Sequence, residues 1–323
     1  MQPKVFVTRA LPGTALAQLA AATSLRCWPG PLPITAAQLR TELRDAEGLL
    51  CLLTDRIDEA LLAAAPALRV VSSCSVGVDH VEVAALSRRR IPLGHTPGVL
   101  VEATADLTFA LLLAAARRLN EAERFVRDGQ WTAARRWEPE LLLGKDLHGA
   151  TLGLIGLGAI GQAVARRAQG FGLRVIGWTP SGRSVPGVTA ASFEQVLAQS
   201  DFISLHLALS AQTTRLINAA ALAQMKHDAI LINTARGGLV DEAALVVALR
   251  TKQLGAAALD VFEQEPLAAD HPLLALPNVV IAPHIGSATL GTRSRMAQLA
   301  VDNLLAGLQG RPMPHCANPE VYS

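Results

Sequence analysis

Short apolar runs alternate with amphipathic segments along the first hundred residues. Apolar runs bounded by polar or glycine-rich positions predict buried strands, whereas apolar residues spaced three and four apart predict helices. We expect strands at residues 4–8, 48–53 and 68–73, and helices at residues 11–22, 36–44 and 57–65. Such an alternation is typical of a parallel sheet with right-handed crossovers.

A second alternating unit follows a break rich in proline and glycine at residues 92–98. A long helix is expected at residues 102–117, and its nearly all-round apolar surface predicts burial in the core or against a second subunit. Strands and helices alternate again from residue 151 to about residue 282, and a last helix is expected at residues 289–307.

The totals agree with two packed α/β domains. The chain has 323 residues, half of them apolar and 17% charged, which is too long for one compact core and too apolar for a disordered protein. We predict two Rossmann-like parallel-sheet domains, with residues 99–288 inserted into a discontinuous domain of residues 1–98 and 289–323. The net charge of +2, without a long run of Lys or Arg, argues against a nucleic-acid partner.

Cysteine usage and hydropathy predict the compartment. The four cysteines form no CxxC pair and show no metal-ligand spacing, so we expect no disulfide framework, no metal site and a reducing, cytoplasmic location. The N-terminus lacks the apolar core of a signal peptide. The longest apolar run, residues 107–116, is too short to cross a bilayer, so no membrane partner is expected.

A glycine-rich loop connects the expected strand at residues 151–155 to a helix at residues 162–169. Gly156 permits a tight turn, Gly158 lets the backbone approach a pyrophosphate, and Gly161 lets the helix pack closely on the strand. The N-terminus of the helix supplies free N–H groups and the positive end of a dipole. This setting predicts dinucleotide binding rather than a purely structural turn.

The end of the next expected strand, at residues 174–178, indicates which dinucleotide is bound. In an NAD-binding domain an acidic residue there accepts hydrogen bonds from the ribose. Here Thr179 follows the strand, Ser181 and Arg183 come next, and residues 173–193 contain no Asp or Glu. Hydroxyls and a guanidinium would bind a 2′-phosphate that a carboxylate would repel. We predict a preference for NADP(H), with NAD(H) as the alternative. The alternative without a binding role is a loop that is only solvated.

Three polar residues each follow an apolar run in the second unit, namely Arg236, Glu265 and His284. Ligands of open parallel sheets bind beyond the carboxyl ends of the strands. Reduction of a 2-oxo acid needs a hydride, a proton donor for the developing alkoxide and a cation for the carboxylate. Histidine is the usual proton donor near neutral pH, a neighbouring carboxylate favours the imidazolium, and arginine matches a carboxylate. Each residue also has an alternative without a catalytic role. Arg236 could form a surface ion pair, Glu265 could be a solvated acid, and His284 could be a structural histidine.

Eight sequence segments, spread over nearly the whole chain, carry a resemblance to a known family. They are residues 75–80 (SVGVDH), 95–100 (HTPGVL), 102–106 (EATAD), 156–161 (GLGAIG), 233–237 (NTARG), 259–266 (LDVFEQEP), 283–289 (PHIGSAT) and 303–308 (NLLAGL). Together these segments resemble the D-2-hydroxyacid dehydrogenase family, most closely its glyoxylate/hydroxypyruvate reductase branch.

The resemblance implies catalytic and substrate-binding roles. His284 would protonate the carbonyl oxygen, Glu265 would hydrogen-bond His284, and Arg236 would hold the carboxylate and carbonyl of the substrate. His284 and Arg236 would thus both contact the substrate. The backbone N–H groups of Val76 and Gly77 would bind its carboxylate. The implied reaction is NADPH-dependent reduction of small 2-oxo acids, such as glyoxylate and hydroxypyruvate, to 2-hydroxy acids.

The resemblance also implies cofactor contacts and an assembly. Asp260 and Gly286 would lie near the nicotinamide amide, and Thr234 would lie close to the nicotinamide ring. Ala159 and Ile160 would contact the pyrophosphate. Thr104 would contact the cofactor from the helix between the domains. Residues 99–288 would be the nucleotide-binding domain, and the discontinuous domain would bind substrate. The family forms homodimers through the nucleotide-binding domain, and the helix at residues 102–117 is a candidate for that surface.

The chain departs from related reductases before Gly144, where they can carry an aromatic residue. Leucines occupy this position and Trp137 is displaced, which favours a somewhat more apolar 2-oxo acid than glyoxylate. The alternatives within the family are D-lactate and phosphoglycerate dehydrogenases. A nucleotide-sensing, corepressor-like protein is the non-enzymatic alternative.

Overall fold

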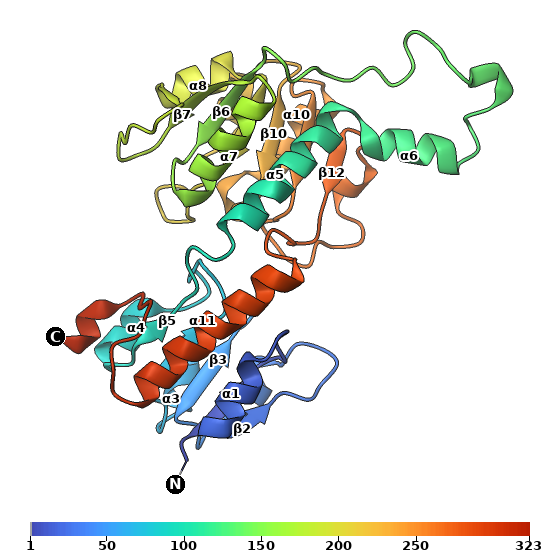
Figure 1. Ribbon diagram of the computed structural model, residues 1–323. Coiled ribbons are helices and arrows are strands. Elements are labelled where there is room, and N and C mark those ends of the chain that lie inside the picture. The colour runs from blue at the N-terminus through green and yellow to red at the C-terminus, as the bar shows by residue number, and fades with distance from the viewer. Residues whose placement is uncertain (1) are drawn as a thin grey trace. The chain divides into compact units, whose positions relative to one another are not determined.

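The computed structural model describes residues 2–323, which form two compact units (Figure 1). Unit 1 contains the described residues up to Leu100 together with Ser287–Ser323, and unit 2 contains Val101–Gly286. These junctions lie two residues from those expected at 98/99 and 288/289. Both units are built on parallel sheets with helical crossovers, which confirms the predicted fold class.

Unit 1 contains a five-stranded parallel sheet in the order β2-β1-β3-β4-β5. Its strands are β1 (Lys4–Val7), β2 (Ser24–Cys27), β3 (Gly48–Cys51), β4 (Val70–Ser73) and β5 (Leu93–Gly94). Its helices are α1 (Ala15–Ala22), α2 (Ala36–Glu42), α3 (Glu59–Ala63), α4 (Val83–Arg88) and α11 (Leu290–Leu308). Strands β3 and β4 are buried at every position, as expected for central strands with helices on both faces.

The C-terminal helix α11 completes unit 1 by covering one face of its sheet (Figure 1). Ala297, Ala300, Val301 and Leu304 are fully buried in a cluster with strand residues such as Val5. The small side chains let the helix approach the sheet closely, and the Ser72 hydroxyl donates to the Ala300 carbonyl oxygen at 2.8 Å. The tail helix expected from the sequence is therefore part of the core of unit 1.

Unit 2 contains a seven-stranded parallel sheet in the order β12-β11-β10-β9-β6-β7-β8. Its strands are β6 (Thr151–Ile155), β7 (Arg174–Trp178), β8 (Thr189–Ala190), β9 (Phe202–Leu205), β10 (Ile230–Asn233), β11 (Ala256–Leu259) and β12 (Val279–Ile281). Its helices are α5 (Val101–Ala116), α6 (Leu119–Arg127), α7 (Ala159–Gly170), α8 (Phe193–Gln199), α9 (Ala219–Ala223) and α10 (Glu242–Arg250). The strands expected at residues 151–155 and 174–178 have the predicted bounds.

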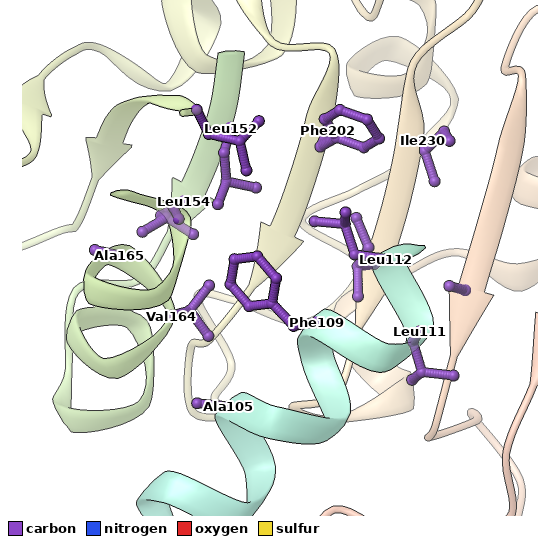
Figure 2. Packing of buried hydrophobic residues seen from close by; sticks show 14 of the residues in the cluster. Ala105, Phe109, Leu111, Leu112, Leu152, Leu154, Val164, Ala165, Phe202 and Ile230 are labelled. Carbon is purple, nitrogen blue, oxygen red and sulfur yellow. The ribbon is translucent and has the colours of Figure 1, made fainter. Parts of the chain in front are cut away.

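Helix α5 packs against its own sheet, beside α7 (Figure 2). Phe109 and Leu112 are buried in one cluster with Leu152, Val164 and Phe202 from β6, α7 and β9. The helix ends where Arg118 adopts a left-handed backbone with φ +52°. Most of its apolar surface is therefore used inside unit 2, which weakens its candidacy as the surface between two subunits.

Some elements differ from the sequence expectation. The first helix begins at Ala15 rather than residue 11, because Gly13 has φ +86° and cannot be helical. Strand β2 and helices α4 and α6 had not been expected. They are short. The apolar residues of α6 do have helical spacing, at Leu119, Ala122, Phe125 and Val126, but none of them is buried in the core of the unit.

Among the described residues, no helix is long and apolar enough to cross a membrane.

Candidate active site

Three neighbouring strands, β10, β11 and β12, place the predicted catalytic residues at one edge of the sheet in unit 2. They pair in parallel with Asn233 level with Leu259, and Leu259 level with Ile281. Their carboxyl ends therefore meet at the same edge, and each strand leads directly into a polar loop. These loops carry Arg236, Glu265 and His284.

His284 and Glu265 form a hydrogen-bonded pair. The distance from His284 Nδ1 to Glu265 Oε2 is 2.7 Å, and the side chains are 27% and 31% exposed. Glu265 Oε1 also accepts the Phe262 N–H at 3.0 Å. Burial by itself raises the pKa of Glu265, but the hydrogen bonds from His284 and Phe262, with the charges of His284 and Arg236, outweigh it and hold the pKa below its usual value. An ionised carboxylate only accepts hydrogen bonds, so Nδ1 of His284 carries a proton and Nε2 is its free nitrogen.

The backbone that carries His284 is held by Asp260. Its carboxylate accepts the N–H groups of Ile285 at 2.7 Å and Gly286 at 2.8 Å, and its carbonyl oxygen accepts the His284 N–H at 2.8 Å. Burial raises the pKa of Asp260, and the two backbone hydrogen bonds partly oppose this rise. His284 has φ +55°, a conformation that few residues other than glycine adopt and that these three bonds stabilise.

Asn233, which had no role assigned from the sequence, shapes the loop of Arg236. Its side-chain amide donates to the Arg236 carbonyl oxygen at 2.8 Å, and its oxygen accepts the Ala235 N–H at 3.0 Å. The Arg236 guanidinium donates to the Ala235 carbonyl oxygen at 2.9 Å, and its charge helps to lower the pKa of Glu265. Asn233 is buried at the end of an apolar strand, and that position is the signal that could have revealed it.

Buried threonines connect α5 to the same loops. The Thr104 hydroxyl donates to the Gly286 carbonyl oxygen at 3.2 Å, and the Thr108 and Thr234 hydroxyls lie 2.9 Å apart. Thr108 also donates to the Thr104 carbonyl oxygen at 2.8 Å. The sequence analysis included Thr104, Thr234 and Gly286 but missed Thr108. Its signal is a hydroxyl four residues after Thr104, at the start of the apolar half of the helix.

The glycine loop after β6 fits a dinucleotide. Gly156 has φ +103°, and a Cβ there would lie 2.6 Å from the backbone of His206. A Cβ on Gly161 would lie 2.2 Å from the Gly156 carbonyl oxygen, so this helix–strand approach requires glycine. A Cβ on Gly158 would meet no atom within 4 Å, and no side chain caps the start of α7 there. Gly158 thus faces open space in front of free N–H groups, as anion binding requires.

The remaining cofactor candidates lie around this loop. Ala159 and Ile160 form the first turn of α7, and neither is buried. Thr179 follows β7 and is half-buried, whereas Ser181 and Arg183 are exposed. Among the described residues none hydrogen-bonds to the Arg183 guanidinium, which leaves its donors available.

Val76 and Gly77, the predicted carboxylate-binding residues, lie in unit 1 shortly after β4. They are half-buried, and neither donates its N–H to another described residue. Two consecutive unpaired backbone donors are typical of an anion-binding turn.

The glycine loop and the His284–Glu265 pair lie at the same edge of one parallel sheet, because all its strands run in the same direction. Together they define an enzyme of the nicotinamide-dependent oxidoreductase class. The family model for the D-isomer specific 2-hydroxyacid dehydrogenase, NAD binding domain, matches residues 109–286. The chain belongs to the D-isomer specific 2-hydroxyacid dehydrogenase family.

Similar proteins cover the full chain. A glyoxylate reductase of Korarchaeum cryptofilum (strain OPF8) is 45% identical over 99% of this chain and 97% of its own. A crystal structure of a protein from Thermus thermophilus has a TM-score of 0.92 at 51% identity, covering 97% of this chain and 99% of its own. An NADPH-dependent glyoxylate/hydroxypyruvate reductase from Sinorhizobium meliloti, in complex with NADP and malonate, has a TM-score of 0.88 at 33% identity, covering 99% and 98%.

Replacement of Gly158 by alanine separates folding from cofactor binding. Its φ of −72° is open to alanine and the added methyl meets no protein atom, so Gly158→Ala is expected to keep the wild-type melting temperature. The methyl would occupy space in front of the N–H groups of α7, so the Kd for NADPH is expected to rise by about tenfold or more. Calorimetric titration and thermal melting measure the two effects.

Gly170→Ala is the matched control, because it lies at the other end of α7 and also has no atom near its added methyl. The Kd for NADPH should stay at the wild-type value in this variant, and its melting temperature should be equal or slightly higher, because alanine is the better helix former. A Gly158→Ala protein that binds NADPH as tightly as the wild type would contradict the assignment of the loop.

Proposed function

We propose that this enzyme reduces small 2-oxo acids, namely glyoxylate and hydroxypyruvate, to 2-hydroxy acids with NADPH. The observation that carries the proposal is the 2.7 Å hydrogen bond between His284 Nδ1 and Glu265 Oε2 at the edge of the sheet. The relatives named glyoxylate reductase and the Sinorhizobium meliloti reductase support the substrate class.

His284 acts as the proton donor. Because Nδ1 is bonded to Glu265, Nε2 is the nitrogen that transfers a proton to the carbonyl oxygen of the substrate. The ionised Glu265 stabilises the positive imidazolium before transfer and keeps the ring in one orientation. The bound nicotinamide supplies the hydride that the carbonyl carbon accepts. Proton and hydride together convert the C=O bond into a CH–OH group.

Substrate orientation is assigned to three groups. The Arg236 guanidinium binds the carboxylate and polarises the carbonyl, since its planar donors match two oxygens. The unpaired N–H groups of Val76 and Gly77 bind the carboxylate. We accordingly assign substrate binding to unit 1 and nucleotide binding to unit 2.

Each part of the cofactor has candidate binding residues. Gly158, Ala159 and Ile160 at the start of α7 would hold the pyrophosphate. Asp260, Gly286, Thr234 and Thr104 would hold the nicotinamide, and hydrogen bonds among these residues and with Thr108 keep them in place. Thr179, Ser181 and Arg183 would hold the 2′-phosphate.

Replacement of the proton donor is expected to abolish turnover but not folding. His284→Asn is the suitable variant, because asparagine tolerates the positive φ that would strain alanine. Its kcat for glyoxylate is expected to fall by about 10²- to 10⁴-fold. Glu265→Gln keeps an acceptor for the Phe262 N–H but removes the charge beside the imidazolium, so a smaller fall is expected. Loss of NADPH absorbance measures both.

The exposed His227 provides the control, and His227→Asn should have the wild-type rate. A His284→Asn enzyme with near wild-type kcat would rule out His284 as proton donor. A wild type that reduces neither glyoxylate nor hydroxypyruvate would overturn the proposed substrates.

Cofactor preference is tested at Arg183. If its guanidinium binds the 2′-phosphate, Arg183→Ala raises the KM for NADPH by about tenfold and leaves the KM for NADH unchanged. The matched control is Arg250→Ala, at the exposed end of α10. Equal increases for the two cofactors, or a wild-type preference for NADH, would contradict NADPH specificity.

We propose a homodimer formed through unit 2. The segment at residues 119–143 exposes several large apolar side chains, and Figure 1 shows this segment extending away from the sheet of its own unit. The exposed residues are Leu119, Val126, Trp131, Trp137 and Leu143. Such apolar exposure on one segment is typical of a protein–protein contact and supports this segment over α5.

The dimer is tested by light scattering after size-exclusion chromatography. The wild type is expected at twice the chain mass, and Val126→Asp at the mass of one chain, because a charge would be buried unpaired in the contact. Glu123→Asp on the same helix is the control. A monomeric wild type would overturn this assignment.

A further inference from the structure

A short hydrogen-bonded chain lies beneath the turn of residues 75–77. The Ser73 and Ser75 hydroxyl oxygens are 2.7 Å apart, and Ser73 Oγ is 3.0 Å from His80 Nε2. The Ser75 hydroxyl donates to the Gly77 carbonyl oxygen at 2.8 Å. Ser73 is fully buried and Ser75 is 3% exposed, so water does not compete for the bond between their hydroxyls.

The last acceptor, the Gly77 carbonyl oxygen, sets the donor and the acceptor in every hydrogen bond of this series. A carbonyl oxygen can only accept, so the one proton of the Ser75 hydroxyl is used at Gly77. Ser75 must then accept from Ser73, and Ser73 in turn must accept from His80 Nε2. The donor and the acceptor of each hydrogen bond are therefore fixed, and removal of one hydroxyl interrupts the series of hydrogen bonds.

All three carbonyl oxygens of the turn are engaged. The Ser75 carbonyl accepts the Thr96 N–H at 2.8 Å, the Val76 carbonyl lies 3.1 Å from His95 Nδ1, and the Gly77 carbonyl accepts from Ser75. The N–H groups of Val76 and Gly77 donate to no described residue. The turn is thus anchored through its acceptors, and two neighbouring donors are left for an anion.

We propose that Ser73, Ser75 and His80 are positioning residues that set the affinity of the enzyme for the substrate carboxylate. Ser73 and Ser75 are buried, so they act through the turn rather than by binding a ligand themselves. They act by holding the peptide units of Val76 and Gly77 in the orientation that binds a carboxylate. The proposal rests on the proposed function of these two N–H groups.

A positioning role predicts a change in substrate affinity without a change in chemistry. Because the turn binds the carboxylate equally before and during hydride transfer, Ser73→Ala is expected to raise the KM for glyoxylate by about tenfold, with kcat within about twofold of the wild type. The KM for NADPH should not change. Ser73→Thr retains a hydroxyl and should restore most of the affinity, and Ser75→Ala should reproduce the effect of Ser73→Ala.

Ser72→Ala is the matched control. Ser72 is the preceding residue of β4 and equally buried, but its hydroxyl bonds to Ala300 in α11 rather than to the turn. It should lower the melting temperature about as much as Ser73→Ala and leave the KM for glyoxylate unchanged. An equal rise in KM in both variants would reduce Ser73 to a structural residue and overturn the proposal.

A binding measurement separates this proposal from the proposed function. Oxamate, a non-reducible 2-oxo acid analogue, is titrated into enzyme saturated with NADPH. Weaker binding by Ser73→Ala than by the wild type supports the positioning role, even if the enzyme turns over no 2-oxo acid. A wild type that reduces glyoxylate while Ser73→Ala keeps its KM and its oxamate affinity would overturn the positioning role alone.

Discussion

The buried carboxylate of Asp260 is the constraint on which the candidate active site depends. Its two oxygens take the N–H groups of Ile285 and Gly286, and its backbone takes that of His284. A buried carboxylate is costly unless it is hydrogen-bonded, so the loop after β12 has one favourable arrangement around it. That arrangement holds His284 at a positive φ, from which its ring reaches Glu265. Asp260, which is proposed to contact the cofactor, is therefore also the anchor of the loop that carries His284.

The same physical solution recurs in both units, where the ends of parallel strands present unpaired backbone N–H groups. In unit 2 the donors belong to the start of α7, and the absence of a side chain at Gly158 leaves them accessible. In unit 1 they belong to Val76 and Gly77, and hydrogen bonds accepted by the carbonyl oxygens of the same turn fix its backbone. Backbone donors suit anions because they are fixed in position and have no titration of their own. Binding of the proposed pyrophosphate and carboxylate would thus require little rearrangement.

Helix α5 connects core packing to the site. Phe109 and Leu112 fix the helix on the sheet, while Thr104 and Thr108 on the same helix hydrogen-bond to the loops that carry Gly286 and Thr234. The apolar residues set where the helix lies, and in that position the threonine hydroxyls reach their partners in these loops.

The sequence by itself determined the class of fold, the glycine loop and the three candidate catalytic residues. These are local properties: the strands at residues 151–155 and 174–178 follow from short apolar runs, and Gly156 and Gly161 follow from a turn that no larger residue fits. The proximity of the three candidate residues could be inferred because the carboxyl ends of parallel strands lie at the same end of a sheet.

The tertiary structure decided every feature that depends on contacts between residues far apart in the sequence. It paired Asp260 with the N–H groups of Ile285 and Gly286, brought Thr108 to Thr234, and buried α5 in its own unit while leaving residues 119–143 exposed. It also joined Ser73, Ser75 and His80 into one directed chain, because hydrogen bonds require distances and angles that spacing along a chain does not specify.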